Sequence, residues 1–365
     1  MRQTRYHVRM SKKIRVSFHI AALGLIALAF FARVYRLADK NIWWDEGWTV
    51  WMGQHDWAWI ALRTASDEHP PLHYWLMNLW QGVFGPDVVT GRFFSLAFGV
   101  LGVALLFLAL ARFNIWWSQD IKNYTLSAFF AWASVYFVWQ WTLTERRAAN
   151  QSRWKLFWLG YVGAAFLALF SHYLAALIIL ANNIFVGLAL LAQWRAGKNP
   201  LPLLWRWSAA QIAVVILLAP WLYLYLQKGA TWTAAPTFDF TLFLRLAATV
   251  LTLGVTTYIE NYTWLVIALL AIAALSAGWI LIRQTPNAVF AKKRWSVGYA
   301  LLIALIPPAL IYLLALTPAA IFAPKIHAPK IQARYLMMLT PALALLLAFG
   351  VLFAARYSKF VALAL

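Results

Sequence analysis

Residues 42–48 read Ile42-Trp43-Trp44-Asp45-Glu46-Gly47-Trp48, and residues 66–75 read Ser66-Asp67-Glu68-His69-Pro70-Pro71-Leu72-His73-Tyr74-Trp75. Both stretches belong to a window that holds seven of the 11 Asp and Glu residues, between Asp39 and Asp87, opposed only by Lys40 and Arg63. Eight of the 23 Trp residues also lie there. Trp prefers the headgroup zone of a bilayer, so acids among tryptophans favour a site at a membrane surface.

The composition is that of a membrane protein. The 365 residues are 64% apolar and 12% charged, with a mean hydropathy of +0.68, which is too apolar for a soluble domain. Several apolar runs reach the roughly 20 residues that cross a bilayer as a helix. The sequence therefore predicts an all-α, polytopic transmembrane protein with about 8–10 spans.

Charge and cysteine content exclude other classes. The net charge of +20 comes from short Lys and Arg clusters between apolar runs, which is typical of cytoplasmic loops and does not indicate nucleic-acid binding. The chain has no Cys, so a disulfide and a thiolate metal site are both excluded.

The pattern predicts one membrane domain over residues 1–365 in the cell membrane, with a basic cytoplasmic tail at 1–16. A first span at 17–37 would place the acid-rich loop 38–90 on the outer face. In that loop we expect two interfacial helices, one capped by Asp45 and running to about Thr64, the other at Leu72–Phe84 after the Pro70-Pro71 break. A second external loop is expected at 227–261. Because the sequence stops within an apolar run, we expect a truncated C-terminus.

Further spans are expected at residues 91–111, 124–143, 156–170, 174–194, 208–226, 262–282, 297–316 and 336–355. The number of spans between two basic segments conflicts with the positive-inside rule, because an odd number of spans places the two segments on opposite faces. Arg112 and Arg146 both suit the cytoplasm, yet only the run at 124–143 separates them. A span is missing after Phe113, or 91–111 and 114–143 form an irregular, partly re-entrant pair, or 240–257 is a true span and the middle of the chain is inverted.

A family resemblance rests on the order of six motifs. These are Trp44-Asp45-Glu46, Glu68-His69-Pro70-Pro71-Leu72-His73-Tyr74-Trp75, Gly91-Arg92-Phe93-Phe94-Ser95, Trp117-Ser118-Gln119-Asp120-Ile121-Lys122-Asn123-Tyr124, Ser171-His172-Tyr173 and Ala333-Arg334-Tyr335-Leu336. Together they resemble the GT-C membrane glycosyltransferases of the protein O-mannosyltransferase and aminoarabinose (lipid A) transferase superfamily. The similarity runs from about residue 17 to 355, and the chain lacks one family span near 113/114 and the family's C-terminal part.

The resemblance implies an activity at the outer face: transfer of a sugar from a polyprenyl-phosphate donor to a lipid, glycan or protein acceptor. It also implies that the catalytic acid of the first external loop is Asp45 and that a second acid is Asp120.

The chemistry of such a donor agrees with a single base. A phosphate leaves without needing a proton, so one carboxylate suffices for an inverting displacement. Asp45 is the first candidate, with Glu46 and Asp120 beside it. The alternative is structural: Asp45 then only caps its helix, and Glu46 only complements the helix dipole.

Negative charge develops on the departing phosphate, and cations or other polar groups are needed to stabilise it. Arg92, Lys122 and Arg334 flank span starts and suit this task, although such residues often only anchor a span in the headgroup layer. Further candidates for donor binding are Glu68, His69, His172 and Tyr335. No cofactor is required by the sequence, while a divalent metal on Glu68 and Asp120 is compatible with their ligand chemistry.

Two alternatives to a glycosyltransferase stay open. A polytopic lipid transporter or flippase would place charges or broken helices at mid-bilayer, whereas the acids here gather outside the spans. A degenerate, inactive relative of the glycosyltransferases is the third reading, because a span is lost.

Overall fold

The computed structural model describes residues 12–67, 69–106, 112–145, 154–227, 239–282, 288–316 and 333–354. Every regular element in these ranges is a helix, which confirms the predicted all-α class. The elements are α1 (Lys12–Val34), α2 (Trp44–Met52), α3 (Trp57–Thr64), α4 (Leu72–Phe84), α5 (Val88–Leu106), α6 (Arg112–Ser118), α7 (Tyr124–Glu145), α8 (Trp154–Ser171), α9 (Ala175–Arg195), α10 (Leu201–Gln227), α11 (Phe240–Leu253), η2 (Ile259–Tyr262), α12 (Thr263–Ile282), α13 (Ala288–Leu316), η3 (Ala333–Leu339) and α14 (Thr340–Ala354).

Within the described ranges, five segments are long and apolar enough to cross a membrane: Trp154–Ser171, Ala175–Arg195, Leu201–Gln227, Ile259–Ile282 and Lys292–Leu313. Four shorter apolar helical segments accompany them: His19–Val34, Val88–Val103, Phe240–Leu253 and Leu336–Leu352. The chain is therefore an integral membrane protein.

Large apolar side chains on the long helices lie on the outside of the fold. On α10, Ile212 and Ile216 are 59% and 63% exposed, and on α12 Leu275 is 70% exposed. Exposed apolar surface of this extent marks a contact with lipid or protein. In a helix of membrane length it is the expected lipid-facing side.

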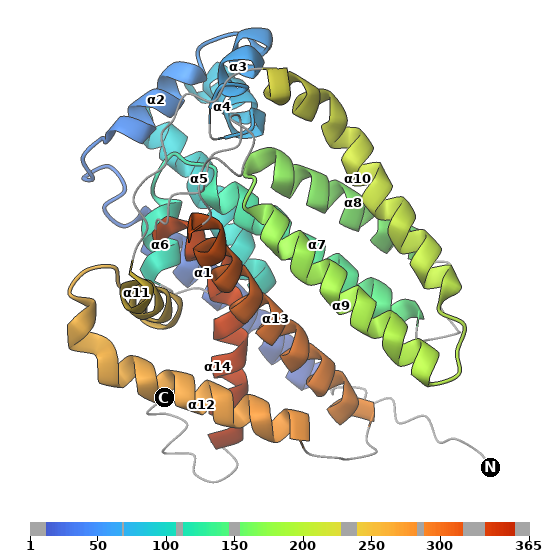
Figure 1. The fold of residues 1–365 in the computed structure, drawn as a ribbon. Helices are drawn as coiled ribbons and strands as arrows, with labels where there is room; N and C mark the ends of the chain where they lie inside the picture. Colours follow the sequence, from blue (N-terminus) through green and yellow to red (C-terminus); the bar gives the residue numbers. More distant parts are fainter. Residues whose placement is uncertain are drawn as a thin grey trace.

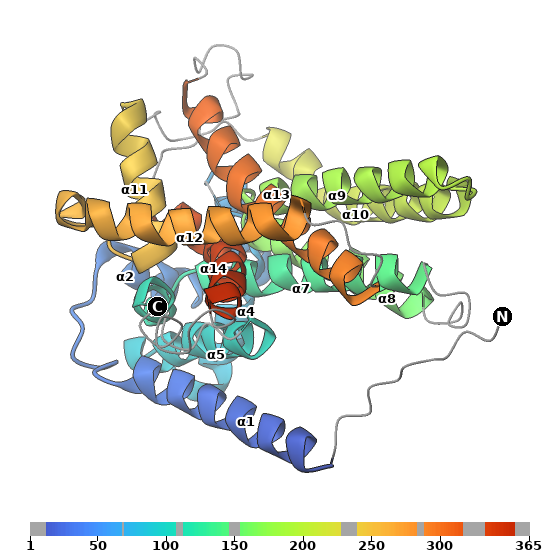
Figure 2. The same ribbon diagram turned by 90° about the horizontal axis from the view of Figure 1, so that it is seen from below.

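The short helices α2, α3 and α4 cap one end of the long ones, at the top of Figure 1. Helices α7, α8, α9 and α10 form one side of the molecule, while α11, α12, α13 and α14 form the other. Helix α1 packs along α5 at the edge, as Figure 2 shows. This arrangement gives the acid-rich loop a rigid base.

The acid-rich loop differs from the prediction in one helix. The expected helix 45–64 is two helices, because the chain turns at Gly53 and restarts at Asp56, whose carboxylate accepts a hydrogen bond from the Trp59 N–H at 2.9 Å. The prediction that Asp45 caps its helix is wrong: Trp43 holds the cap position with no side-chain hydrogen bond, and Asp45 lies in the first turn. The prediction for α4 is confirmed at both ends.

A single side chain of α4 holds the turn between α2 and α3. The Asn78 amide donates to the carbonyls of Gly53 and His55 at 3.0 and 3.1 Å and accepts from the Trp57 indole N–H at 2.9 Å. Gly53 leaves room for Gln81, which a Cβ at that position would meet at 2.9 Å. The three helices thus form one unit.

The parity conflict corresponds to an irregular return of the chain beside α5. Gly91 lies against Ile121, and Gly99 lies against Ser118, where an added Cβ would meet those side chains at 2.7 and 2.6 Å. Helix α6 has seven residues, about 10 Å, and does not cross a bilayer by itself. Of the three alternatives, this geometry fits the partly re-entrant pair.

The alternative that residues 240–257 form a true span does not fit. Helix α11 has 14 residues, about 21 Å, against the roughly 30 Å of a hydrocarbon core. It ends at Gly254, whose φ of +69° suits glycine and where an added Cβ would meet the Phe113 backbone nitrogen at 2.8 Å. Within the described part of the predicted loop 227–261, residues 240–253 are helical and residues 259–261 belong to η2. The predicted tail 1–16 and the C-terminal end lie mostly outside the described residues.

The absence of native Cys allows a direct test of the two faces. Gln54 lies in the α2–α3 turn and Lys198 follows α9, whose 21 residues span about 31 Å. We expect single variants Gln54→Cys and Lys198→Cys to react with an impermeant maleimide from opposite faces of sealed cells or vesicles. Labelling of both from one face would contradict the arrangement, and the cysteine-free chain is the control.

Candidate functional site

The centre of the site is a buried ion pair between α2 and α5. The side chains of Glu46 and Arg92 are 0% and 1% exposed, and the guanidinium binds the carboxylate through two bonds, Nε to Oε1 at 2.8 Å and Nη2 to Oε2 at 2.7 Å. Arg92 also donates to the carbonyls of Leu37 and Asn41 at 2.8 and 3.2 Å. The Ile121 N–H donates to Glu46 at 3.3 Å.

These contacts give Glu46 and Arg92 a different task from the one predicted. A buried carboxylate bound by both arms of a guanidinium does not present a base to a substrate, and the guanidinium is occupied by protein acceptors. The pair joins α2, the link after α1, α5 and the loop 119–123. It is therefore a positioning element beneath the exposed part of the site.

Asp45, one residue earlier, faces outward from the same turn. Its side chain is 24% exposed, and its Oδ2 lies 3.0 Å from Arg334 Nη1 and 3.7 Å from Lys122 Nζ. The three residues come from α2, η3 and the α6–α7 loop, so they meet only in the folded chain. One partly exposed carboxylate between two cations is the central feature of the site.

Arg334 is held by aromatic rings. Its guanidinium carbon lies 5.5 Å from the Trp43 ring centre, 5.6 Å from Tyr124 and 5.9 Å from Trp117. Rings at this range attract a cation and orient it. The segment η3 is itself fixed to α7, since the Trp132 indole donates to the Met338 carbonyl at 2.7 Å.

Asp120 lies in the α6–α7 loop, on the same side of the fold as Asp45, as its neighbour Lys122 demonstrates. Its carboxylate is 2% exposed and is paired with Lys40. Burial raises the pKa of Asp120 to about 6, while the ammonium of Lys40 acts in the opposite direction. A role for Lys40 was not predicted from the sequence. The signal that could have indicated one is that Lys40 and Arg63 are the two Lys or Arg residues between Asp39 and Asp87.

Two histidines adjoin the cluster formed by Asp45, Lys122 and Arg334. His69, before α4, and His172, at the α8–α9 turn, are buried with ring centres 5.0 Å apart. Burial, and then nearby cationic groups, lower the pKa of His69 well below its usual range and that of His172 to about 3. The Leu174 N–H donates to His172 Nδ1 at 3.1 Å, so the neutral ring carries its proton on Nε2. Both rings are thus neutral polar groups at physiological pH.

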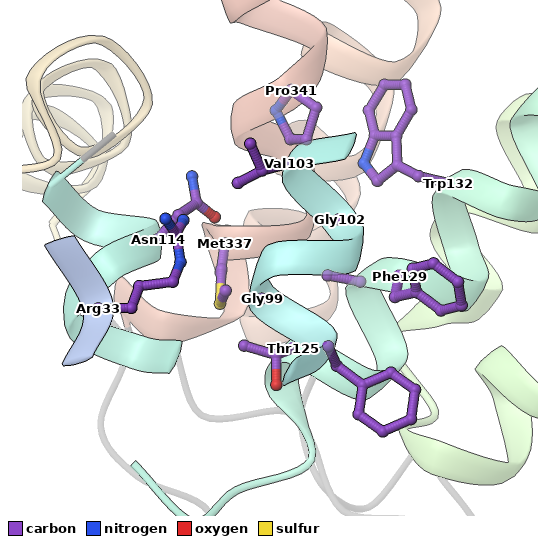
Figure 3. A pocket seen from close by; sticks show the side chains of 12 residues that line it. Arg33, Gly99, Gly102, Val103, Asn114, Thr125, Phe129, Trp132, Met337 and Pro341 are labelled. Atoms are coloured by element: carbon purple, nitrogen blue, oxygen red, sulfur yellow. The ribbon is translucent and has the colours of Figure 1, made fainter. Parts of the chain in front are cut away.

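A small cavity is lined by residues that follow two side chains of this cluster in the sequence (Figure 3). It has a volume of about 30 Å³ and is lined by Arg33, Asn114, Thr125 and Met337, among others. Thr125 follows the loop that carries Lys122, and Met337 follows Arg334 by one turn. A cavity of this size holds about one water molecule and excludes a sugar or a prenyl chain.

The predicted metal ligands and two donor-binding candidates are only partly described. Glu68 lies outside the described residues, and the side chain of Tyr335 is not described although its backbone belongs to η3. In the described ranges, no three His, Asp or Glu residues gather as a metal site would require. The metal on Glu68 and Asp120 stays a prediction.

No family model matches the sequence, and no curated protein matches it either. The fold is similar to that of a solved structure, ArnT from Cupriavidus metallidurans bound to undecaprenyl phosphate, with 13% sequence identity and a TM-score of 0.46. The match covers 93% of this chain and 60% of that chain, so this chain spans about three fifths of the length of ArnT.

The buried ion pair predicts a stability effect. Arg92→Ala leaves the Glu46 charge buried without its partner, which we expect to lower the free energy of unfolding by about 3–5 kcal/mol in an SDS titration of the micelle-bound protein. Arg92→Ala/Glu46→Gln should recover part of this loss, because the unpaired charge is removed.

The matched control is Arg36→Ala, which breaks an ion pair with Asp39 whose side chains are 67% and 58% exposed. Exposed pairs contribute little, so its unfolding curve should overlay that of the unchanged chain. Equal losses for Arg92→Ala and Arg36→Ala would contradict the positioning role.

Asp120 predicts a pH dependence of stability. Its pKa rises from 3.8 to about 6 on folding, so between these values the folded chain binds the proton more tightly than the unfolded chain. The resulting stabilisation is present below about pH 4 and is lost as the pH rises through 6. The melting temperature of the unchanged chain minus that of Asp120→Asn should therefore fall between pH 4 and 7. A constant or rising difference would show that burial does not dominate.

Proposed function

We propose that the chain transfers a sugar from a polyprenyl-phosphate donor to an acceptor hydroxyl at the outer face of the membrane, with inversion at the anomeric carbon and with Asp45 as the base. The observation that carries this proposal is the contact of Lys122 and Arg334 with the same carboxylate oxygen of Asp45. A base and a phosphate-binding site need this proximity, because the acceptor and the leaving phosphate meet at one carbon atom.

The reaction divides between these groups. The acceptor oxygen forms a bond to the anomeric carbon while its proton passes to Asp45, and the bond from that carbon to the phosphate oxygen breaks with the electron pair on the phosphate. Arg334 and Lys122 stabilise the charge that develops on the departing phosphate. The phosphate needs no proton to leave, so no general acid is assigned.

Asp45 is suited to this role by its exposure. Its side chain is 24% exposed, whereas the side chains of Glu46 and Asp120 are 0% and 2% exposed. We assign Glu46 and Asp120 to positioning: Glu46 holds the Ile121 backbone and Asp120 holds Lys40. Both fix the loop that presents Lys122.

The neutral histidines complete the proposed donor site. His69 and His172 lie next to the Lys122 and Arg334 charges, which contribute to the low pKa of each ring. Neutral imidazoles bind sugar hydroxyls or phosphate oxygens without adding charge. The donor's prenyl chain would follow the apolar surface of the membrane helices.

The test is turnover with polyprenyl-phosphate sugars in detergent or liposomes. Asp45→Asn keeps the shape of the side chain but removes its basicity, so the rate should fall by roughly 100-fold or more. Asp39→Asn, which changes an exposed acid outside the cluster, should retain the rate of the unchanged chain.

Unchanged turnover in Asp45→Asn would remove Asp45 from the mechanism. No turnover by the unchanged chain with any donor would contradict the glycosyltransferase assignment and favour a transporter or an inactive relative. Lys122→Met and Arg334→Met provide a second readout, since loss of a phosphate contact should weaken donor binding as well as turnover.

A further inference from the structure

A groove at the other end of the molecule combines an apolar floor with basic residues. It runs between α9 and α13, has a volume of about 870 Å³, and is lined by Leu188, Leu191, Arg195, Arg294, Leu302 and Leu305, among others. Figure 1 shows the end of α9 and the start of α13 at the lower end of the molecule, away from α2, α3 and α4. We call it the basic groove.

Aromatic packing closes one end of the basic groove. The rings of Phe185 and Tyr299 stack with centres 3.8 Å apart, and the Tyr299 hydroxyl donates to the Asn182 side-chain oxygen at 2.5 Å. From this contact the groove extends to Arg195 at the last residue of α9 and to Arg294 in the second turn of α13. Its charge is therefore concentrated toward one end.

The arginines lack an anionic partner within the described part of the chain: neither forms a salt bridge there. Both are exposed. The acids whose side chains are not described are Glu68 and Glu145.

The length of the groove fits one leaflet. The segment of α13 from Arg294 to Leu305 rises about 17 Å, close to half of the roughly 30 Å hydrocarbon core. An acyl chain that starts at the arginines would therefore end near the bilayer midplane. Gly298 faces open space, since no atom lies within 4 Å of an added Cβ.

We propose that the basic groove binds one anionic phospholipid, with its phosphate between Arg195 and Arg294 and an acyl chain along α13 past Gly298. Arginine forms paired hydrogen bonds to phosphate oxygens, and the leucines of both helices contact the hydrocarbon. This site is separate from the Asp45 cluster and does not depend on the proposed transferase activity.

The experiment measures lipid binding to the detergent-purified chain by native mass spectrometry. Phosphatidylglycerol and phosphatidylcholine with the same acyl chains are the probes. We expect preferential binding of phosphatidylglycerol and about 30-fold weaker binding of it to Arg195→Ala/Arg294→Ala, because each basic residue near the membrane surface contributes about fivefold to the attraction of an anionic lipid.

The matched control is Lys198→Ala/Lys292→Ala, which removes two exposed charges that are not among the groove residues. It should bind phosphatidylglycerol as the unchanged chain does. Gly298→Leu keeps both arginines but fills the groove, so it should weaken binding of both lipids.

Four results would overturn the proposal. One is equal binding of the two lipids, and another is the same loss for the lysine and the arginine variants. The third is displacement of phosphatidylglycerol by millimolar inorganic phosphate, which would mean that the acyl chain contributes nothing. A lipid-independent dimer that is abolished by Gly298→Leu would assign the groove to a second copy of the chain and would also overturn it.

Discussion

The bidentate contact between Glu46 and Arg92 is the constraint on which the acidic end of the molecule depends. Two opposite charges without solvent exposure are stable only when their geometry is good and their remaining hydrogen-bonding atoms are satisfied. Here the guanidinium binds both carboxylate oxygens, and Leu37, Asn41 and Ile121 supply backbone partners. The link after α1, α2, α5 and the α6–α7 loop are therefore held in one relative position.

This fixed arrangement explains how the irregular segment after α6 still brings Lys122 to Asp45. The loop after α6 lies beside α5 at two close contacts, Gly91 with Ile121 and Gly99 with Ser118. It therefore presents Lys122 to Asp45 although α6 is too short to cross a membrane. The stable buried pair supports a less regular, charged surface above it, where Asp45, Lys122 and Arg334 meet.

The two ends of the fold have opposite chemistry. One end gathers acids, tryptophans and cations in short helices and loops, and we assign it to the donor phosphate and the acceptor. At the other end, exposed arginines border an apolar groove between two long helices. Both ends suit a phosphate-bearing lipid, but the described lining of the groove has no carboxylate that could accept a proton.

The sequence by itself determined the class and most helices. Apolar runs of membrane length are enough to predict helices because a backbone in hydrocarbon must satisfy its own hydrogen bonds. The Pro70-Pro71 break and the run after it likewise gave α4 with its observed ends. The sequence also named Asp45, Lys122 and Arg334 as candidates, which the fold brings into contact, and their roles stay predictions.

The tertiary structure decided the roles within that set. The sequence made Glu46 a catalytic candidate and Arg92 a donor-binding candidate, yet in the structure they pair with each other beneath Asp45. Two residues separated by 46 positions neutralise each other only after α2 and α5 pack. The split of α2 from α3 likewise depends on Asn78 and Gln81 of α4. Local patterns record which side chains prefer water or lipid, whereas a partner across the fold decides which charge is buried and which faces a substrate.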